Sequence, residues 1–333
     1  MRRAGGLWND VVRFQSLENA TLRAARGKRH RPAVARYLFE RETRLITLQE
    51  RLRRSTWRPS PPVVFEIHDP KRRTISAPPF EDRVVHQALI GAIEEALERP
   101  MIGGSYACRR GKGTHRAIDH AQRLLRRNEW CLKLDVAKFF ASLQHGVVLD
   151  TLTRRIKDQR VLALARVTVE EEPSCQASRG LPIGALTSQW FANCVLDRLD
   201  HVALEGLGAR GYVRYMDDIL VFGASKNELI DKERELTGFL ESRLELSFKE
   251  RARRLAPTST GVPFLGWTLY GRHRRPRRSN VRRVRARLRR AAWEASTGRR
   301  PRRSYESAVA AIACHLSGGS TRGLRESLFG RPP

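Results

Sequence analysis

Hydrophobic and polar positions divide this chain of 333 residues into a helical beginning, a mixed centre and a helical end. Residues 7–56 predict helices, because their leucines recur at helical spacing around one basic interruption, RGKRHRP. The leucines that carry this pattern are Leu38, Leu45, Leu48 and Leu52.

The centre of the chain alternates apolar runs typical of strands with amphipathic runs typical of helices. Prolines and β-branched residues predict a strand–turn–strand hairpin within 55–79, and FEDRVVHQALIGAIEEALE predicts a helix over 80–98. A glycine-rich basic loop then leads into a helix within 103–127, and WCLKLD predicts a buried strand that ends at Asp135.

Later segments continue this alternation up to an Arg-rich helical end. The predicted elements are a helix over 147–165, a helix within 178–204 capped by Thr187 or Ser188, a hairpin over 211–223, a helix over 226–244, and short strands over 244–250 and 262–271. Because the order lacks the regular period of a doubly wound parallel sheet, it favours an α+β fold with a mainly helical extension at each end.

Charge adds a class of partner to this picture. The formal net charge is +29, which favours a polyanion such as nucleic acid. Over half of the excess lies in residues 271–333, which contain 18 Arg, no Lys and 3 Glu. The planar guanidinium suits phosphate contacts and base stacking. A solubilising tail is the alternative, but Trp293 and Leu288 are among residues that give this segment apolar faces, so we expect it to fold and bind nucleic acid.

Cysteines and apolar runs limit the class of protein further. The five cysteines show neither CxxC nor Cys/His spacing, which predicts no zinc site and no disulfide framework and fits a reducing compartment. The first residues, MRRAGGLWNDVVRF, lack a signal-peptide core, and no window approaches eighteen continuous apolar residues. The sequence therefore predicts a cytoplasmic protein without a membrane partner.

Three aspartates carry the candidate chemistry. Asp135 ends one apolar strand, whereas Asp217 and Asp218 lie between the two apolar runs of GYVRYMDDILVFG. Since aspartate is depleted in strands, the pair indicates either a solvated turn or a cation site. If the strands are neighbours, three carboxylates converge and raise one another's pKa unless cations neutralise them. Mg²⁺ prefers such oxygen ligands, and two ions about 3.5–4 Å apart catalyse in-line phosphoryl transfer.

Motifs around these aspartates resemble those of reverse transcriptases. YMDD resembles the catalytic motif, LKLDVAKFF the first catalytic motif, GLPIGALTSQWFAN the template-and-nucleotide motif, and FLGW the primer grip. SYACRRGKGTHRAI and PKRRTISAPPFEDRVVHQAL resemble finger motifs of group II intron and related bacterial enzymes. The resemblance covers roughly residues 63–270, with the motifs in the right order.

The resemblance implies a right-hand polymerase with fingers, an antiparallel palm sheet and a helical thumb. The implied regions are a helical N-terminal extension over 1–62, fingers over 63–130, a palm with the primer grip over 131–270, and an Arg-rich thumb over 271–333.

The resemblance also implies roles for the carboxylates and their surroundings. Asp135, Asp217 and Asp218 would bind two Mg²⁺ ions together with the carbonyl of Val136. Phe140 would be the steric gate that excludes a 2′-OH, although Phe139 and Phe140 could both be ordinary core. On this expectation an extended backbone would bury one ring and free the other.

Other matched residues would bind the nucleotide and the primer. Lys71 and Arg73 would bind the triphosphate, although PKRR is also typical of a plain basic turn. Lys249 would protonate the departing pyrophosphate, although a single lysine on a charged edge is usually solvated. The remaining matches are Ile183 and Gln189 for the nucleotide, and Phe264, Leu265, Gly266 and Trp267 for the primer grip.

The segment IGALTSQ favours one subfamily. Many reverse transcriptases have Gln where Ile183 stands and Ser-Pro where Ser188 and Gln189 stand, whereas IGxxxSQ is similar to the pattern of diversity-generating retroelements. On the length of the chain we also expect no separate RNase H, maturase or endonuclease domain after residue 333. This resemblance implies copying of a template-repeat RNA into cDNA, with frequent errors opposite adenine. Because Ile183 supplies only an apolar contact, weaker constraint of the pairing geometry would follow, unless Ile183 merely packs under the loop.

The resemblance implies several partners and leaves alternatives open. Template RNA, the cDNA or primer strand and dNTPs would bind, along with an oligomeric helical accessory variability protein, in a bacterial or phage-encoded setting. A retron, a group II intron or a phage-defence reverse transcriptase would use the same chemistry. An alternative of another class is a non-catalytic RNA-binding protein that has kept the fold, which the intact aspartates disfavour.

Overall fold

The computed structural model describes residues 3–68, 72–171 and 178–330. At the beginning of the chain four helices form, as predicted, and their leucine faces are buried: Leu45, Leu48 and Leu52 are at most 1% exposed. The extended backbone at Arg13 separates the first two helices. Their bounds are α1 Trp8–Val12, α2 Phe14–Ala25, α3 Pro32–Phe39 and α4 Arg41–Arg53.

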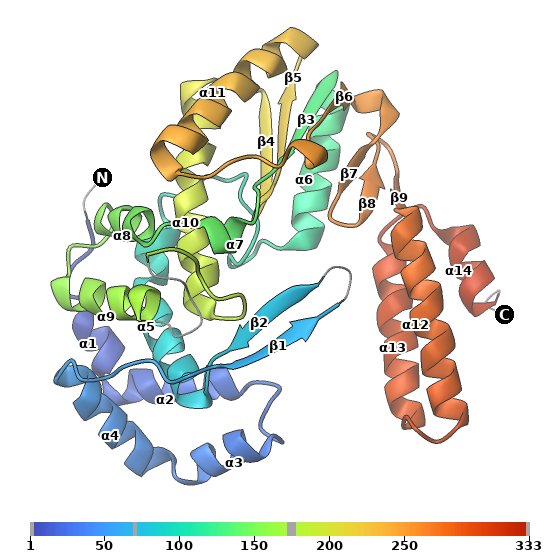
Figure 1. The fold of residues 1–333 in the computed structure, drawn as a ribbon. Helices are drawn as coiled ribbons and strands as arrows, with labels where there is room; N and C mark the ends of the chain where they lie inside the picture. The colour runs from blue at the N-terminus through green and yellow to red at the C-terminus, as the bar shows by residue number, and fades with distance from the viewer. Residues whose placement is uncertain (1–2, 69–71, 172–177, 331–333) are drawn as a thin grey trace.

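A two-stranded hairpin and two long helices follow (Figure 1). Strands β1 (Val63–Ile67) and β2 (Arg73–Ala77) pair antiparallel, as predicted, and Val63, Val64 and Phe65 of β1 are exposed. Helix α5 (Phe80–Glu98) is largely buried, and α6 (Thr114–Arg127) begins directly after Gly113, whose φ is 105°. Strand β1 of the hairpin is thus open to solvent.

The central sheet contains four antiparallel strands in the order β4-β5-β3-β6. Both predicted strand segments are confirmed, because β3 spans Trp130–Asp135, and β4 (Gly211–Tyr215) and β5 (Asp218–Gly223) form the predicted hairpin. The fourth strand is β6 (Arg254–Pro257), which pairs with the first residues of β3.

Alternate residues of the central strands bury opposite faces of this sheet. Leu132 and Val221 join the large core formed with α10 and α11. Leu220 and Phe222 join a second core with α6 and the hairpin β7–β8. Both faces of the sheet are therefore covered, which leaves the ends of its two inner strands, β3 and β5, near Asp135 as the place where polar side chains gather.

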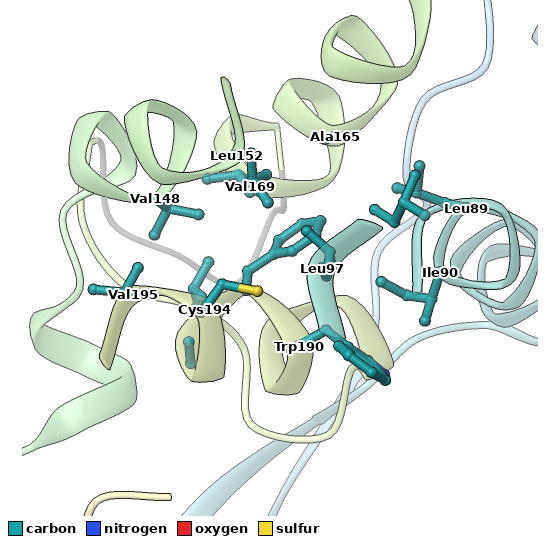
Figure 2. Packing of buried hydrophobic residues seen from close by; sticks show 14 of the residues in the cluster. Leu89, Ile90, Leu97, Val148, Leu152, Ala165, Val169, Trp190, Cys194 and Val195 are labelled. Atoms are coloured by element: carbon teal, nitrogen blue, oxygen red, sulfur yellow. The ribbon is translucent and has the colours of Figure 1, made fainter. Parts of the chain in front are cut away.

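Helices between the strands form the large core. Side chains of α5, α8, α9 and α10 converge there, among them Leu89, Leu152, Val169 and Cys194 (Figure 2). The bounds are α7 Phe139–Ser142, α8 His145–Thr153, α9 Gln159–Glu170, α10 Leu186–His201, the π-helical η1 Val202–Gly206 and α11 Lys226–Leu244.

Two helix predictions need correction. The single helix expected over 147–165 is two helices, because the Asp158 carboxylate caps α9 by accepting from the N–H groups of Arg160 and Val161. The cap of α10 is Ala185 rather than Thr187 or Ser188, which lie inside the helix and are buried.

The strand predicted over 244–250 is wrong. Glu245 adopts φ 54° after α11, and the segment that follows makes only an isolated bridge between Phe248 and Val136. A positive φ turns the chain out of extended geometry, so regular pairing begins only at β6. Short 3₁₀ turns, η2 Glu250–Ala252 and η3 Thr258–Thr260, flank that strand.

The Arg-rich end is helical, as predicted. Three short strands, β7 (Val262–Phe264), β8 (Trp267–Leu269) and β9 (Arg274–Pro276), connect it to the rest of the chain (Figure 1). The helices are α12 Arg278–Ser296, α13 Arg302–Ser317 and α14 Arg322–Phe329. Across the described ranges, no helix combines the length and apolarity needed to cross a bilayer.

Candidate active site

The turn between β4 and β5 holds two of the three aspartates. Tyr215 pairs with Asp218, so Met216 and Asp217 are the two central turn residues. Met216 has φ 54°, a left-handed conformation that a side chain rarely adopts. Positive φ at the first central position is typical of a type II′ hairpin turn, where glycine is usual. The hairpin therefore keeps a strained, non-glycine residue immediately before Asp217.

Asp135 lies directly beside this turn. In the antiparallel pairing of β3 with β5, Asp135 is opposite Asp218. The N–H of Val136 donates to the carbonyl of Asp217 over 3.2 Å. The structure thus brings together Asp135, Asp217 and Asp218, as the sequence predicted, and places the main chain of Val136 between them.

The surroundings disfavour the charged forms of the two turn carboxylates. Burial, and then repulsion from Asp135, raise the pKa of Asp217. Burial also raises the pKa of Asp218 to about 6, although Lys133 opposes this rise. Proximity of like charges in a poorly solvated site has this effect unless a cation is present.

Lys133 is a site residue that the sequence prediction missed. It forms an ion pair with Asp218, with side-chain exposures of 14% and 20%. Its ammonium also lies 5.7 Å from the centre of the Phe264 ring. Lys133 is two residues before Asp135 in a strand, so both project from the same face. A lysine at that position inside an apolar run is a signal that the sequence did contain.

The donor set suits a divalent cation, although its carboxylates are not arranged around one common position. Among the described residues, no group of three or more His, Cys, Asp or Glu side chains surrounds a common metal position. Asp218 instead pairs with Lys133. Asp135, Asp217 and the Val136 carbonyl offer hard oxygen ligands, and a bound cation would offset the repulsion that raises the pKa of Asp217.

The β1–β2 hairpin contributes a cation to the site. Arg73 is the first residue of β2, and its charge lowers the pKa of Asp217, opposing the effects of burial and of Asp135. Its guanidinium therefore lies within electrostatic reach of the aspartates. Lys71, predicted to share this role, lies outside the described residues.

The hairpin is also hydrogen-bonded to the loop that carries Ile183. The N–H of Ser76 donates to the carbonyl of Ile183 over 2.9 Å. Gly184 has φ 128°, and a Cβ there would lie 2.5 Å from the carbonyl oxygen of Ser76. Only glycine fits this close approach, so Ile183 is held against strand β2 while its own side chain stays partly exposed.

Phe139 and Phe140 differ in exposure, as predicted for core and gate. Phe139 is buried and Phe140 is partly exposed, with ring centroids 5.4 Å apart. The geometric reason differs from the expectation, because both residues start the short helix α7 after a left-handed Lys138. The carbonyl of Phe140 accepts from the N–H of Leu181, which brings the candidate gate next to the Ile183 loop.

Gln189 and Lys249 make different contacts. Gln189, in the first turn of α10, accepts a 3.5 Å contact from the Cys108 thiol. Lys249 has an exposed side chain, and its N–H donates to the carbonyl of Asp135 over 2.8 Å. The main chain of Lys249 is therefore beside the aspartates.

The predicted primer-grip residues form a tight turn. Phe264 pairs with Trp267, and both central residues have positive φ, 45° at Leu265 and 87° at Gly266, which is typical of a type I′ turn. Asn280 of α12 donates from Nδ2 to the carbonyl of Gly266 over 2.8 Å. This bond joins the turn to the first C-terminal helix.

Sequence comparison finds a protein family that matches this chain. The sequence model described as reverse transcriptase (RNA-dependent DNA polymerase) matches residues 67–269. Protein YkfC of Escherichia coli (strain K12) is 24% identical over 241 residues, covering 60% of this chain and 63% of that protein. Nuclear intron maturase 1, mitochondrial, of Arabidopsis thaliana is 32% identical over 95 residues, covering 28% of this chain and 13% of the maturase. The chain thus spans less than two thirds of either relative.

Structural comparison agrees on the fold. The apo telomerase of Candida tropicalis truncated from its C-terminal domain superposes with a TM-score of 0.51 at 13% identity, covering 66% of this chain and 56% of that one. Together with the family match, this likeness shows a right-hand polymerase fold of mixed helices and antiparallel sheets, the class expected from the sequence.

Proposed function

This chain belongs to the reverse transcriptase (RNA-dependent DNA polymerase) family, and on that premise we propose that it extends a DNA primer along an RNA template. The observation that carries the proposal is the pairing of Asp135 with Asp218 beside the Asp217 turn. Three carboxylates that the fold forces together are costly in the absence of a cation, so their convergence supports a metal-dependent role.

In this proposal Asp135, Asp217, Asp218 and the Val136 carbonyl would hold two Mg²⁺ ions. When bound, such ions activate the primer hydroxyl and stabilise the leaving pyrophosphate. The chain's own residues orient the substrates around them. Arg73, already close enough to affect Asp217, would bind the triphosphate with Lys71, and Phe140 would lie under the sugar.

Substitution of one aspartate tests the activity. Asp217→Asn keeps the size of the side chain but removes its charge, and we expect primer extension on an RNA template with Mg²⁺ to fall by about 1,000-fold or more. Asp231→Asn, at an exposed position of α11, is the matched control and should retain activity. Full activity of the Asp217→Asn variant would exclude this site, and an inactive wild-type protein that binds RNA would favour the non-catalytic alternative.

We further propose that the RNA is a template repeat and that copying is error-prone at adenine, as in diversity-generating retroelements. The support is Ile183 followed by Ser188 and Gln189, with Ile183 held against β2 by the Ser76 bond. An intron-encoded enzyme is the second candidate, because a similar protein is named an intron maturase. Neighbouring DNA with a template repeat and a variable repeat that differ at adenines would support the diversity-generating retroelement over the intron-encoded enzyme.

The charge distribution supports the proposed partners. Exposed arginines of α12, among them Arg282, Arg285 and Arg289, offer phosphate contacts to a template–primer duplex. Binding should weaken steeply with salt because counterions are released from the nucleic acid. The oligomeric accessory variability protein belongs to this proposal too, and co-purification with a helical-bundle protein encoded nearby would test it.

A further inference from the structure

Arg214, in β4 two residues before Met216, is completely buried. Its side chain and that of Asp200 on α10 are each 0% exposed. The two form a bidentate pair, with Nε to Oδ1 at 2.6 Å and Nη2 to Oδ2 at 2.5 Å. Tyr212 donates its hydroxyl to the same Oδ1 over 2.6 Å. An ion pair of this depth costs much desolvation energy, so its retention calls for an explanation beyond stability.

The other N–H groups of Arg214 bond to Asn193 and to the aspartate turn. Nη1 donates to Oδ1 of Asn193 over 2.6 Å and to the carbonyl of Met216 over 3.3 Å, and Nη2 donates to the carbonyl of Asn193 over 3.3 Å. With the two bonds to Asp200, all five guanidinium N–H groups have acceptors. One of those acceptors is the strained residue that precedes Asp217.

The main chain of Arg214 is fixed from the opposite side. Its N–H donates to the carbonyl of Gly104 over 2.9 Å, and its carbonyl accepts from the N–H of Tyr106 over 3.0 Å. Asn193 closes the arrangement by donating from Nδ2 to the carbonyl of Ala107 over 2.8 Å. Helix α10 and the aspartate turn therefore meet at the guanidinium of Arg214, and the 104–107 loop holds the main chain of the same residue.

We propose that Arg214 is a positioning residue for polymerisation, which fixes the Met216 carbonyl and thereby the placement of Asp217 and Asp218. The inference rests on the proposed function, although Arg214 itself touches neither substrate nor reacting atoms. Lysine has three donors and no planar fork, so it can neutralise Asp200 without also holding Asn193 and Met216. The shape of the guanidinium, rather than its charge, is what the turn requires.

Arg214→Lys tests this inference, with Arg155→Lys as its matched control. Arg155 also forms a buried pair on α10, donating from Nη2 to Asp197 over 2.5 Å, and in the described part of the chain none of its hydrogen bonds reaches the turn. We expect kcat for primer extension to fall about 10- to 100-fold in Arg214→Lys, with KM for dNTP changed less than threefold. Arg155→Lys should lose thermal stability comparably but keep kcat within about threefold of wild type.

A second readout does not depend on activity. In protein without metal or nucleotide, amide hydrogen exchange of the peptide over 211–223 should accelerate in Arg214→Lys and stay at the wild-type rate in Arg155→Lys. If Arg214→Lys does not fold, Asn193→Ala removes one acceptor of Nη1 and should accelerate exchange in the same peptide. Unchanged exchange in the folded variant, or an Arg214→Lys kcat equal to that of Arg155→Lys, would overturn the inference. An inactive wild-type protein would instead reject the proposed function, while the exchange result still stands.

Discussion

Asp135 and Asp218 lie directly opposite each other in the antiparallel pairing of β3 and β5. Side chains in this relationship have Cβ atoms about 4.5–5.5 Å apart, and like charges there destabilise the sheet. Lys133, on the same face as Asp135, offsets the charge of Asp218 by its ion pair. The sheet thus accepts an electrostatic cost where the candidate chemistry lies, which is the expected trade between stability and function.

Asp218 should make the stability of the metal-free protein depend on pH. Because its folded pKa is about 6, above the ordinary value of 3.8, the folded state binds more protons between these pH values than the unfolded state. The free energy of unfolding contributed by Asp218 therefore falls as pH rises through this window, by about 3 kcal/mol in total.

Urea unfolding of wild type and Asp218→Asn between pH 4 and 7 measures this contribution of Asp218 to the free energy of unfolding. Burial lowers the pKa of His86 to about 4, which acts in the opposite direction: its contribution is present above pH 6.5 and is lost as pH falls toward 4. Both proteins retain His86, so subtraction of the two curves cancels it. A difference between the curves that does not change with pH would show that Asp218 titrates normally.

Phe140→Ala should relax selection against ribonucleotides. If this partly exposed ring lies beneath the sugar as proposed, its removal makes room for a 2′-OH, and we expect kcat/KM for rNTP relative to dNTP to rise about 10- to 100-fold. Phe139→Ala is the control, since Phe139 is 3% exposed. That variant should lower the free energy of unfolding by about 3–5 kcal/mol without changing sugar selection. If Phe139→Ala instead changed sugar selection and Phe140→Ala did not, Phe139 would be the gate and Phe140 a core residue.

Ile183→Gln should reduce misincorporation opposite adenine. The amide adds a polar constraint near the nucleotide, so we expect the error frequency at template adenines to fall several-fold, with smaller changes at other bases. Sequencing of cDNA made on one RNA template gives both values. Ile183→Leu keeps an apolar side chain and should leave the error spectrum unchanged. Identical spectra for wild type and Ile183→Gln would mean that Ile183 only packs under its loop.

Gly266→Ala should disturb the primer-grip turn. Gly266 has φ 87°, and a Cβ there would lie 2.5 Å from Nδ2 of Asn280, so we expect a loss of about 1–2 kcal/mol in the free energy of unfolding and a raised KM for primer–template. Gly238→Ala, in α11 with no atom within 4 Å of the added Cβ, should instead stabilise by about 0.5–1 kcal/mol. Melting curves and primer-extension kinetics of both variants make the comparison.

Local sequence patterns predicted the elements that carry the aspartates, but not the contacts beneath them. The apolar run before Asp135 and the two runs around Asp217 identify strands by composition alone, and the strands form. Positive φ at Met216, Glu245 and Leu265 has no such signal, because these residue types normally avoid it. The strand expected over 244–250 failed for this reason.

The pairing of charged side chains inside the fold also could not be predicted from the hydrophobic periodicity. In a strand pattern Lys133 and Arg214 appear as polar interruptions that should face solvent. Lys133 is instead only 14% exposed and Arg214 is completely buried, and each pairs with a carboxylate on another element, Asp218 and Asp200 respectively. Pairing of this kind depends on which elements meet in space, and the order of strands β4-β5-β3-β6 is set by the whole fold. The candidate catalytic residues could therefore be predicted from the sequence, whereas the ion pairs that support them could not.

If Ile183 acts on copying accuracy as proposed, the hydrogen bond from Ser76 to Ile183 has a further consequence. Any movement of the β1–β2 hairpin on a bound nucleotide must either break that bond or carry the Ile183 backbone along with it. Copying accuracy would then depend on the position of the solvent-facing β1–β2 hairpin as well as on the loop proposed to lie at the base pair. Substitutions in the hairpin could change the mutation rate without altering any residue that contacts the template.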